Sequence, residues 1–199
     1  MNRKPCNRVL KLAAVLLVAA APALAADTYE VDAAHSEVSF LVRHLVGRVR
    51  GSFGQFEGKV VMDTANPAAS SVEFTIKAES IDTNVAKRDD HLRSADFFDV
   101  AKYPSLTFAS KKVEKVGDGQ YKVTGDLTLR GVTKEVVLAV EGSPTPMQDP
   151  FGNTKLGGSA TTRLNRKDFG LNWSKSLDGG GLVVGDEVDV TIDIELIKQ

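Results

Sequence analysis

The chain has 199 residues, of which 26% are charged, and its formal net charge at pH 7 is −1. No cluster of basic residues stands out, which argues against a nucleic-acid partner, because phosphate binding needs clustered Lys and Arg. The single cysteine, Cys6, lies near the N-terminus. Residues 26–199 therefore contain no thiol and must fold by core burial without a disulfide.

Residues 1–25 have the three-part organisation of a secretory signal peptide. Four cations precede an apolar run over residues 12–21, and residues 23–25 supply the small side chains that a signal peptidase reads. A membrane anchor is the less favoured alternative, because a spanning helix needs about 20 apolar residues. We expect cleavage after Ala25 and export of residues 26–199. Loss of the four cations lowers the formal net charge from −1 to −5.

Residues 26–199 suit one domain, and period-two alternation is their dominant pattern. In residues 71–79, Val72, Phe74 and Ile76 alternate with polar side chains, and residues 121–130 and 187–197 alternate in the same way. Each segment is typical of a strand with one buried and one solvated face, as in an antiparallel sheet. Weaker strand patterns cover residues 36–45, 54–63, 105–114, 133–141 and 156–165.

About eight strands joined by short turns predict an all-β meander. A meander of that length must protect its edges by closing into a barrel or by folding into two sheets. We favour an extended antiparallel eight-stranded barrel, which is wide enough to admit one small ligand. The aromatic residues are spread over many strands, and periodicity alone does not distinguish a filled barrel from a hollow one.

Residues 80–103, called here the lid segment, interrupt the alternation and are rich in charge. Residues 86–93 predict a short helix, with Asn84 as its N-cap. A long insertion without strands is unusual and tends to be functional. We expect its apolar side chains, Leu92, Phe97 and Phe98, to pack over one mouth of the barrel as a lid.

The charged residues 88–93 have two interpretations. They form a polar rim that receives a ligand head group, with Arg88 or Arg93 attracting phosphate or quinone oxygens. Alternatively, they form an exposed helix face with ion pairs such as Asp89 with Arg93, and this interpretation is favoured from the residues alone.

Catalytic and metal-binding patterns are weak in this sequence. His35, His44 and His91 lie in three segments without metal-ligand spacing, so we predict no metal site. Neither a nucleophile elbow nor a cysteine nucleophile is present in residues 26–199, and no catalytic residue is predicted. Arg43 and His44 form a second polar point, which either anchors a head group or binds the lid segment. An enzyme that acts on a small hydrophobic or lipid substrate, with His44 or His91 as base, is the alternative hypothesis.

The lid segment contains the sequence RDDHLRSADFFD at residues 88–99, followed by Lys102-Tyr103-Pro104. Residues 125–134 read GDLTLRGVTK and residues 166–170 read RKDFG. With the YxVD and FxxRHL patterns of residues 29–32 and 40–45, these motifs resemble the YceI-like family of polyisoprenoid-binding proteins. The resemblance covers essentially all of residues 26–199. Residues 47–50, GRVR, depart from the family pattern at that strand.

The resemblance implies a lipocalin-like barrel and a periplasmic location. It also implies an apolar tunnel that holds an isoprenoid quinone or polyprenyl phosphate for transport, storage or sequestration. No catalysis and no cofactor are expected, while transient membrane contact and a homodimer are left open. Burial of an isoprenoid gains about 0.8 kcal/mol per CH₂ group and needs no directional chemistry. The predicted ligand-binding residues are Phe40, Val42, Phe53, Phe74, Ile76, Leu92, Phe97, Phe98, Phe108, Leu127 and Trp173. The predicted head-group or rim residues are Arg43, His44, Arg88 and His91.

Overall fold

The computed structural model describes residues 26–142, 145–175 and 183–199. The predicted signal peptide, residues 1–25, lies outside these ranges, so its cleavage stays a prediction. Within the described ranges, no helix has the length and apolar character needed to cross a membrane.

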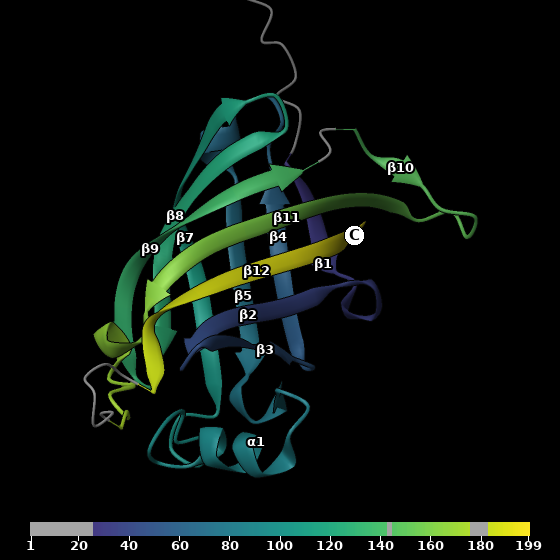
Figure 1. The fold of residues 1–199 in the computed structure, drawn as a ribbon. Coiled ribbons are helices and arrows are strands. Elements are labelled where there is room, and N and C mark those ends of the chain that lie inside the picture. The colour runs from purple at the N-terminus through teal and green to yellow at the C-terminus, as the bar shows by residue number, and fades with distance from the viewer. Residues whose placement is uncertain (1–25, 143–144, 176–182) are drawn as a thin grey trace, which may run out of the picture.

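The described residues form twelve strands and one α-helix, α1 (Ala86–Arg93), at one end of the barrel (Figure 1). The strands are β1 (Asp27–Val31), β2 (Glu37–His44), β3 (Gly47–Phe53), β4 (Phe56–Met62), β5 (Ser71–Lys77), β6 (Ile81–Asp82), β7 (Ser105–Gly117), β8 (Gln120–Leu129), β9 (Val132–Gly142), β10 (Met147–Gln148), β11 (Thr154–Asn165) and β12 (Val184–Lys198).

Two pairs of short strands each act as one bent strand of the barrel. β1 and β2 follow each other along the same edge of β12, and β3 and β4 follow each other along β2 and β1. When each pair is counted once, eight antiparallel strands form a ring that closes through β11 and β12. Each strand lies beside its neighbours in sequence, so the predicted closed eight-stranded barrel with a meander order is confirmed.

All eight predicted strands are present, but the alternation pattern missed β1 and β3. β3 reads GRVRGSF, and its glycines and arginines hide the alternation that Val49 and Phe53 would otherwise provide. β6 and β10 have two residues each, which is too short for any periodicity.

A β-bulge in β7 changes which side chains point into the barrel. The pairing with β8 shifts between Ser110 and Lys112. Before the bulge, Leu106 and Phe108 point inward; after it, Val113 and Lys115 do. An extra residue in one strand reverses the parity of every position that follows.

Helix α1 has the predicted bounds but not the predicted cap. Val85 is the N-cap, without a side-chain hydrogen bond. Asn84 has a left-handed backbone (φ 62°), and its N–H donates to Asp82. Asn84 therefore shapes the turn before the helix, and its assignment as the cap was wrong.

The predicted ion pair between Asp89 and Arg93 was also wrong. Asp89 is only 5% exposed and binds Thr83, whereas Arg93 lies 3.4 Å from Asp90. Asp89 and Arg93 lie on the same side of α1, but each is already bonded to the segment before the helix: Asp89 accepts from Thr83, and Arg93 donates to the carbonyls of Glu79 and Ile81. The helix is therefore not a uniformly solvated surface element.

Candidate functional site

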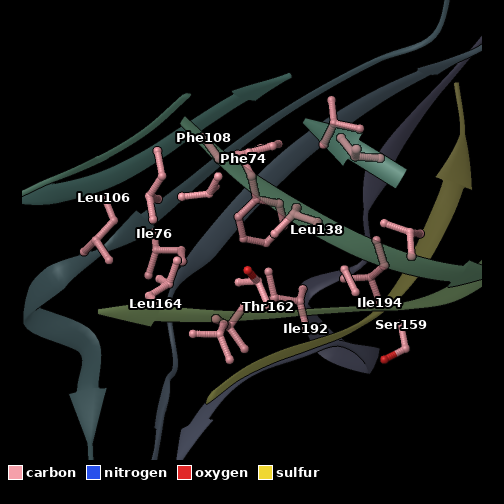
Figure 2. A pocket seen from close by; sticks show the side chains of 18 of the residues that line it. Phe74, Ile76, Leu106, Phe108, Leu138, Ser159, Thr162, Leu164, Ile192 and Ile194 are labelled. Carbon is pink, nitrogen blue, oxygen red and sulfur yellow. The ribbon is translucent and has the colours of Figure 1, made fainter. Parts of the chain in front are cut away.

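A cavity of about 510 Å³ occupies the interior of the barrel. Its wall is built from alternate positions of the strands, as the antiparallel pattern requires. Figure 2 shows Phe74 and Phe108, from β5 and β7, facing Thr162 and Ile192, from β11 and β12. The wall is almost entirely apolar over its middle. The hydroxyl of Thr162 donates to the Val137 carbonyl at 2.9 Å, so this polar group makes its hydrogen bond within the wall.

The structure places ten of the eleven predicted ligand-binding residues on the cavity wall. These are Phe40, Val42, Phe53, Phe74, Ile76, Leu92, Phe97, Phe98, Phe108 and Leu127. Trp173 does not line the cavity; it packs against Phe97 at 5.2 Å between ring centroids, on the far side of that ring. Contact of the ten residues with a ligand stays a prediction.

The apolar residues of the lid segment close one end of the cavity. Leu92, Phe97 and Phe98 line it, and Phe97 is 6% exposed. Phe98 meets Phe53 of β3 edge to face, with ring centroids 5.8 Å apart. This arrangement agrees with the expected lid over one mouth, and it makes the lid part of the barrel core.

Polar groups of the same motif attach the lid segment to the barrel. Asp89 accepts hydrogen bonds from the backbone N–H and hydroxyl of Thr83, and Arg88 donates to the Thr83 hydroxyl and carbonyl. Arg93 donates to the carbonyls of Glu79 and Ile81 at 2.8 and 2.7 Å. Charged residues of the motif are therefore anchors, while its aromatic residues fill the cavity end.

None of the four predicted rim residues lies on the cavity wall. Arg88 binds Thr83 through its Nε and one terminal nitrogen. His91 binds Asp96 at 2.9 Å and packs edge-on against the ring of Trp173 at 5.0 Å. Arg43 and His44 lie near the tip of the β2–β3 hairpin. A head-group role for these four residues gains no support from their positions.

A buried arginine that the sequence did not single out lies on the wall at the lid end. Arg166 is 6% exposed, and its five N–H groups reach the carbonyls of Gly185, Leu171, Trp173 and Val184 and the carboxylate of Asp186. Burial lowers its pKa, and the charge of Asp186 opposes that shift. Arg166 is the first residue of the RKDFG motif, but the sequence does not indicate its role. The fold shows that it holds two separate backbone segments, residues 171–173 and 184–186.

The cavity end opposite the lid segment has a different chemistry. Asp63, Thr64 and Ser70, from the β4–β5 connection, line it together with Lys115 at the end of β7. Thr64 and Lys115 are exposed. Lys115 lies 3.7 Å from Asp118, which is 91% exposed, so this ion pair is loose. The Asp63 carboxylate accepts from the N–H groups of Ala65 and Asn66, and the Ser70 hydroxyl accepts from the N–H of Asp63. Thr64 and Lys115 are therefore the less constrained polar side chains at this mouth.

The three histidines are not brought together. Among the described residues, the one group with metal-ligand geometry is Asp32, His35 and Glu195. The ammonium of Lys155 lies 2.9 Å from Asp32 and 3.0 Å from Glu195, where a cation would otherwise bind. The hydrogen bond from Lys155, followed by that from His35, lowers the pKa of Asp32 to about 2. The group is therefore a structural ion-pair network outside the cavity.

Comparison with known proteins agrees with this geometry. The sequence profile of the YceI-like domain matches residues 29–196. Protein YceI of Escherichia coli O157:H7 is 42% identical over 189 residues, covering 94% of each chain. A UPF0312 protein of Vibrio cholerae is 44% identical over 161 residues, covering 80% of this chain and 85% of the relative.

Solved structures share the fold. BcnA of Burkholderia cenocepacia superposes with a TM-score of 0.71 at 28% identity, over 83% of this chain and 98% of its own. A polyisoprenoid binding domain from Saccharophagus degradans superposes with a TM-score of 0.62 at 18% identity, over 86% and 98%. Because the profile and the relatives cover most of the barrel, the chain belongs to the YceI-like family.

Proposed function

We propose that this protein binds an isoprenoid lipid, such as an isoprenoid quinone or a polyprenyl phosphate, inside the barrel. After export to the periplasm it holds the lipid for transport, storage or sequestration. The observation that carries this proposal is the apolar cavity of about 510 Å³. Pockets for small molecules are generally about 300–1,000 Å³ and mostly apolar.

The wall suits a long hydrocarbon better than a polar substrate. Its side chains come from strands all around the ring and from the lid segment, and they offer contact without directed hydrogen bonds. Each CH₂ group moved from water into such a cavity gains about 0.8 kcal/mol, so several isoprene units supply the affinity. The Saccharophagus degradans domain, which shares this fold, is a polyisoprenoid binding domain.

The polar end of the ligand is assigned to the mouth opposite the lid segment. Lys115 places an exposed ammonium there, only loosely paired with Asp118, and Thr64 and Ser70 line the same opening. A phosphate or a quinone carbonyl accepts hydrogen bonds from such groups. At the other end, Arg166 is the only wall cation among the described residues besides Lys115, and its donors are already used.

The hypothesis of an enzyme with a histidine base receives less support. A general base must reach its substrate within hydrogen-bond distance. Neither His44 nor His91 lines the cavity, and His91 contacts Phe97, Trp173 and Asp96 outside it. We therefore propose binding without catalysis.

Mass spectrometry of organic extracts tests this proposal on protein purified without detergent. We expect a prenyl lipid in amounts approaching one per protein. Added quinone should also raise the melting temperature of delipidated protein, because a ligand that binds only the folded state stabilises it. An extract without prenyl lipid, together with no thermal shift, would contradict the proposal.

A further inference from the structure

The β2–β3 hairpin presents an apolar tip to solvent. Val46 is fully exposed, and Leu45 beside it is 38% exposed. The tip has a defined conformation: Leu45 adopts a left-handed backbone (φ 50°), and its N–H donates to the Val183 carbonyl at 2.9 Å. Two large hydrophobic side chains are therefore held in water by an ordered turn.

Three arginines lie behind this tip on one face of the hairpin. Arg43 and Arg48 are direct cross-strand partners, and Arg50 follows Arg48 on the same side of β3. All three are exposed, and within the described residues none has a carboxylate within ion-pair distance. Like charges placed opposite each other in a sheet are destabilising, and an external anion relieves that repulsion.

Among the residues that the structure describes, the neighbouring segments do not neutralise this patch. Residues 43–50 contain no acidic residue. On the neighbouring part of β12, Asp186 pairs with Lys167 at 2.9 Å and Asp189 pairs with Arg163 at 2.6 Å, while Glu187 is exposed. The hairpin therefore carries a positively charged patch, whereas residues 26–199 as a whole have a formal net charge of −5.

The hairpin lies at the lid end, where the barrel wall is least tied by backbone hydrogen bonds. The outer edge of β3 pairs only at Ser52 and Phe53, with β6. Residues 47–51 have no strand partner on this edge, and the lid segment packs beside the paired end of β3, where Phe98 contacts Phe53. This is the part of the wall that can open without separating a strand ladder.

Protection of a free strand edge explains the arginines of the β2–β3 hairpin but not its apolar tip. Charged residues on an edge strand discourage pairing with other chains, which explains Arg48 and Arg50. An exposed Val46 with Leu45 works against that purpose. An apolar tip flanked by cations is instead the composition of elements that bind at the surface of an anionic bilayer.

We propose that the β2–β3 hairpin docks the lid end of the barrel on an anionic phospholipid bilayer. Leu45 and Val46 enter the interface, while Arg43, Arg48 and Arg50 bind lipid phosphates. The inference deepens the proposed function and rests on it, because it names the surface at which the lipid is exchanged. With the head group at the opposite mouth, the isoprenoid tail lies nearest the lid segment and passes first into the apolar bilayer.

Vesicle co-sedimentation of the purified protein tests this docking. The vesicles are phosphatidylcholine alone or phosphatidylcholine mixed with phosphatidylglycerol. Each cation near an anionic surface contributes about fivefold to binding, so R48E/R50E should weaken binding to the mixed vesicles by more than about 25-fold. V46D should also weaken it. Matched controls are K122E/K134E and V116D, which change exposed residues away from the hairpin.

Preferential binding to the anionic vesicles that is lost in the hairpin variants and retained in the controls supports docking. Equal binding to both vesicles, or equal loss in the control variants, overturns it. Melting temperatures check that each variant folds. Lipid content is measured on the same samples: prenyl lipid without vesicle binding refutes the docking alone, whereas vesicle binding without prenyl lipid refutes the proposed ligand alone.

Discussion

The carboxylate of Asp89 accepts two hydrogen bonds from Thr83, one from its backbone N–H at 2.9 Å and one from its hydroxyl. Both residues are buried, and Arg88 donates to the same hydroxyl at 2.6 Å. This arrangement joins helix α1 to the turn that follows β6. The position of the lid segment therefore depends on the buried carboxylate of Asp89, on the side of α1 that faces the barrel.

Replacement of Asp89 by alanine should lower the free energy of unfolding by about 2–4 kcal/mol, because it leaves buried donors of Thr83 without an acceptor. Urea denaturation measures the change. Asp90→Ala is the matched control: its carboxylate is 77% exposed and makes only a long ion pair, so the change should stay within about 0.5 kcal/mol. Equal losses in the two variants would contradict the anchoring role of Asp89.

Filling the cavity should abolish lipid binding without unfolding the barrel. Ala160 lies on the wall of the cavity in β11, so Ala160→Phe places a ring in the space assigned to the ligand. Ala139 in β9 faces outward and is exposed, which makes Ala139→Phe the control. Lipid in organic extracts should fall at least tenfold in the first variant only. Unchanged lipid in a folded Ala160→Phe protein would place the ligand elsewhere.

Arg166 should not tolerate replacement by lysine. Lysine has three donors on a flexible stem and cannot bond the separate carbonyls that the planar guanidinium reaches. We expect Arg166→Lys to destabilise the fold by about 2–4 kcal/mol in urea denaturation, because buried carbonyls lose their donors. Arg163→Lys, three residues earlier in β11, alters an exposed pair with Asp189 and should cost less than about 0.5 kcal/mol. A small effect at Arg166 would mean that its hydrogen bonds are replaced by water.

The ion-pair network of Asp32 should make stability depend on pH in the acid range. Hydrogen bonds from Lys155 and His35 hold the pKa of Asp32 at about 2, below its ordinary value of 3.8. The folded state therefore favours the ionised carboxylate, and this contribution is present above about pH 4 and lost as the pH falls through about 2. Asp32→Asn should have a lower melting temperature than the wild type at neutral pH, and this difference in melting temperature should shrink as the pH falls toward 2. A constant difference in melting temperature across this range would contradict the assignment.

Most of the barrel could be predicted because antiparallel strands with one solvated face alternate visibly. The pattern of Val72, Phe74 and Ile76 is an example, and all three line the cavity. β3 could not be found in this way because Gly47 and Gly51 replace side chains at inward positions. A Cβ atom at Gly51 would lie 2.4 Å from the ring of Phe40, so the packing of that ring requires the glycine.

The candidate site was predictable where apolar character alone decides position, as for Phe53 and Phe108. The polar residues were not, because the sequence does not reveal which carbonyls a guanidinium will meet. Arg88 was predicted to bind a ligand head group; in the structure its guanidinium donates to Thr83, and the head-group role stays a prediction. Trp173 was predicted to bind the ligand; in the structure it packs against Phe97 and does not line the cavity, although Leu171, two residues earlier, does.

The closing strand has a consequence for when this protein can fold. β12 borders β1 and β2 on one side and β11 on the other, so the first and last strands complete the ring together. A hydrogen bond from Glu195 to Ser36 spans 159 positions. Such distant pairings form slowly, because long loops must close before the contacts form. The barrel cannot be complete until its last fifteen-residue strand is available. The barrel therefore closes only after β12 has been synthesised, which is compatible with the proposed export of an unfolded chain.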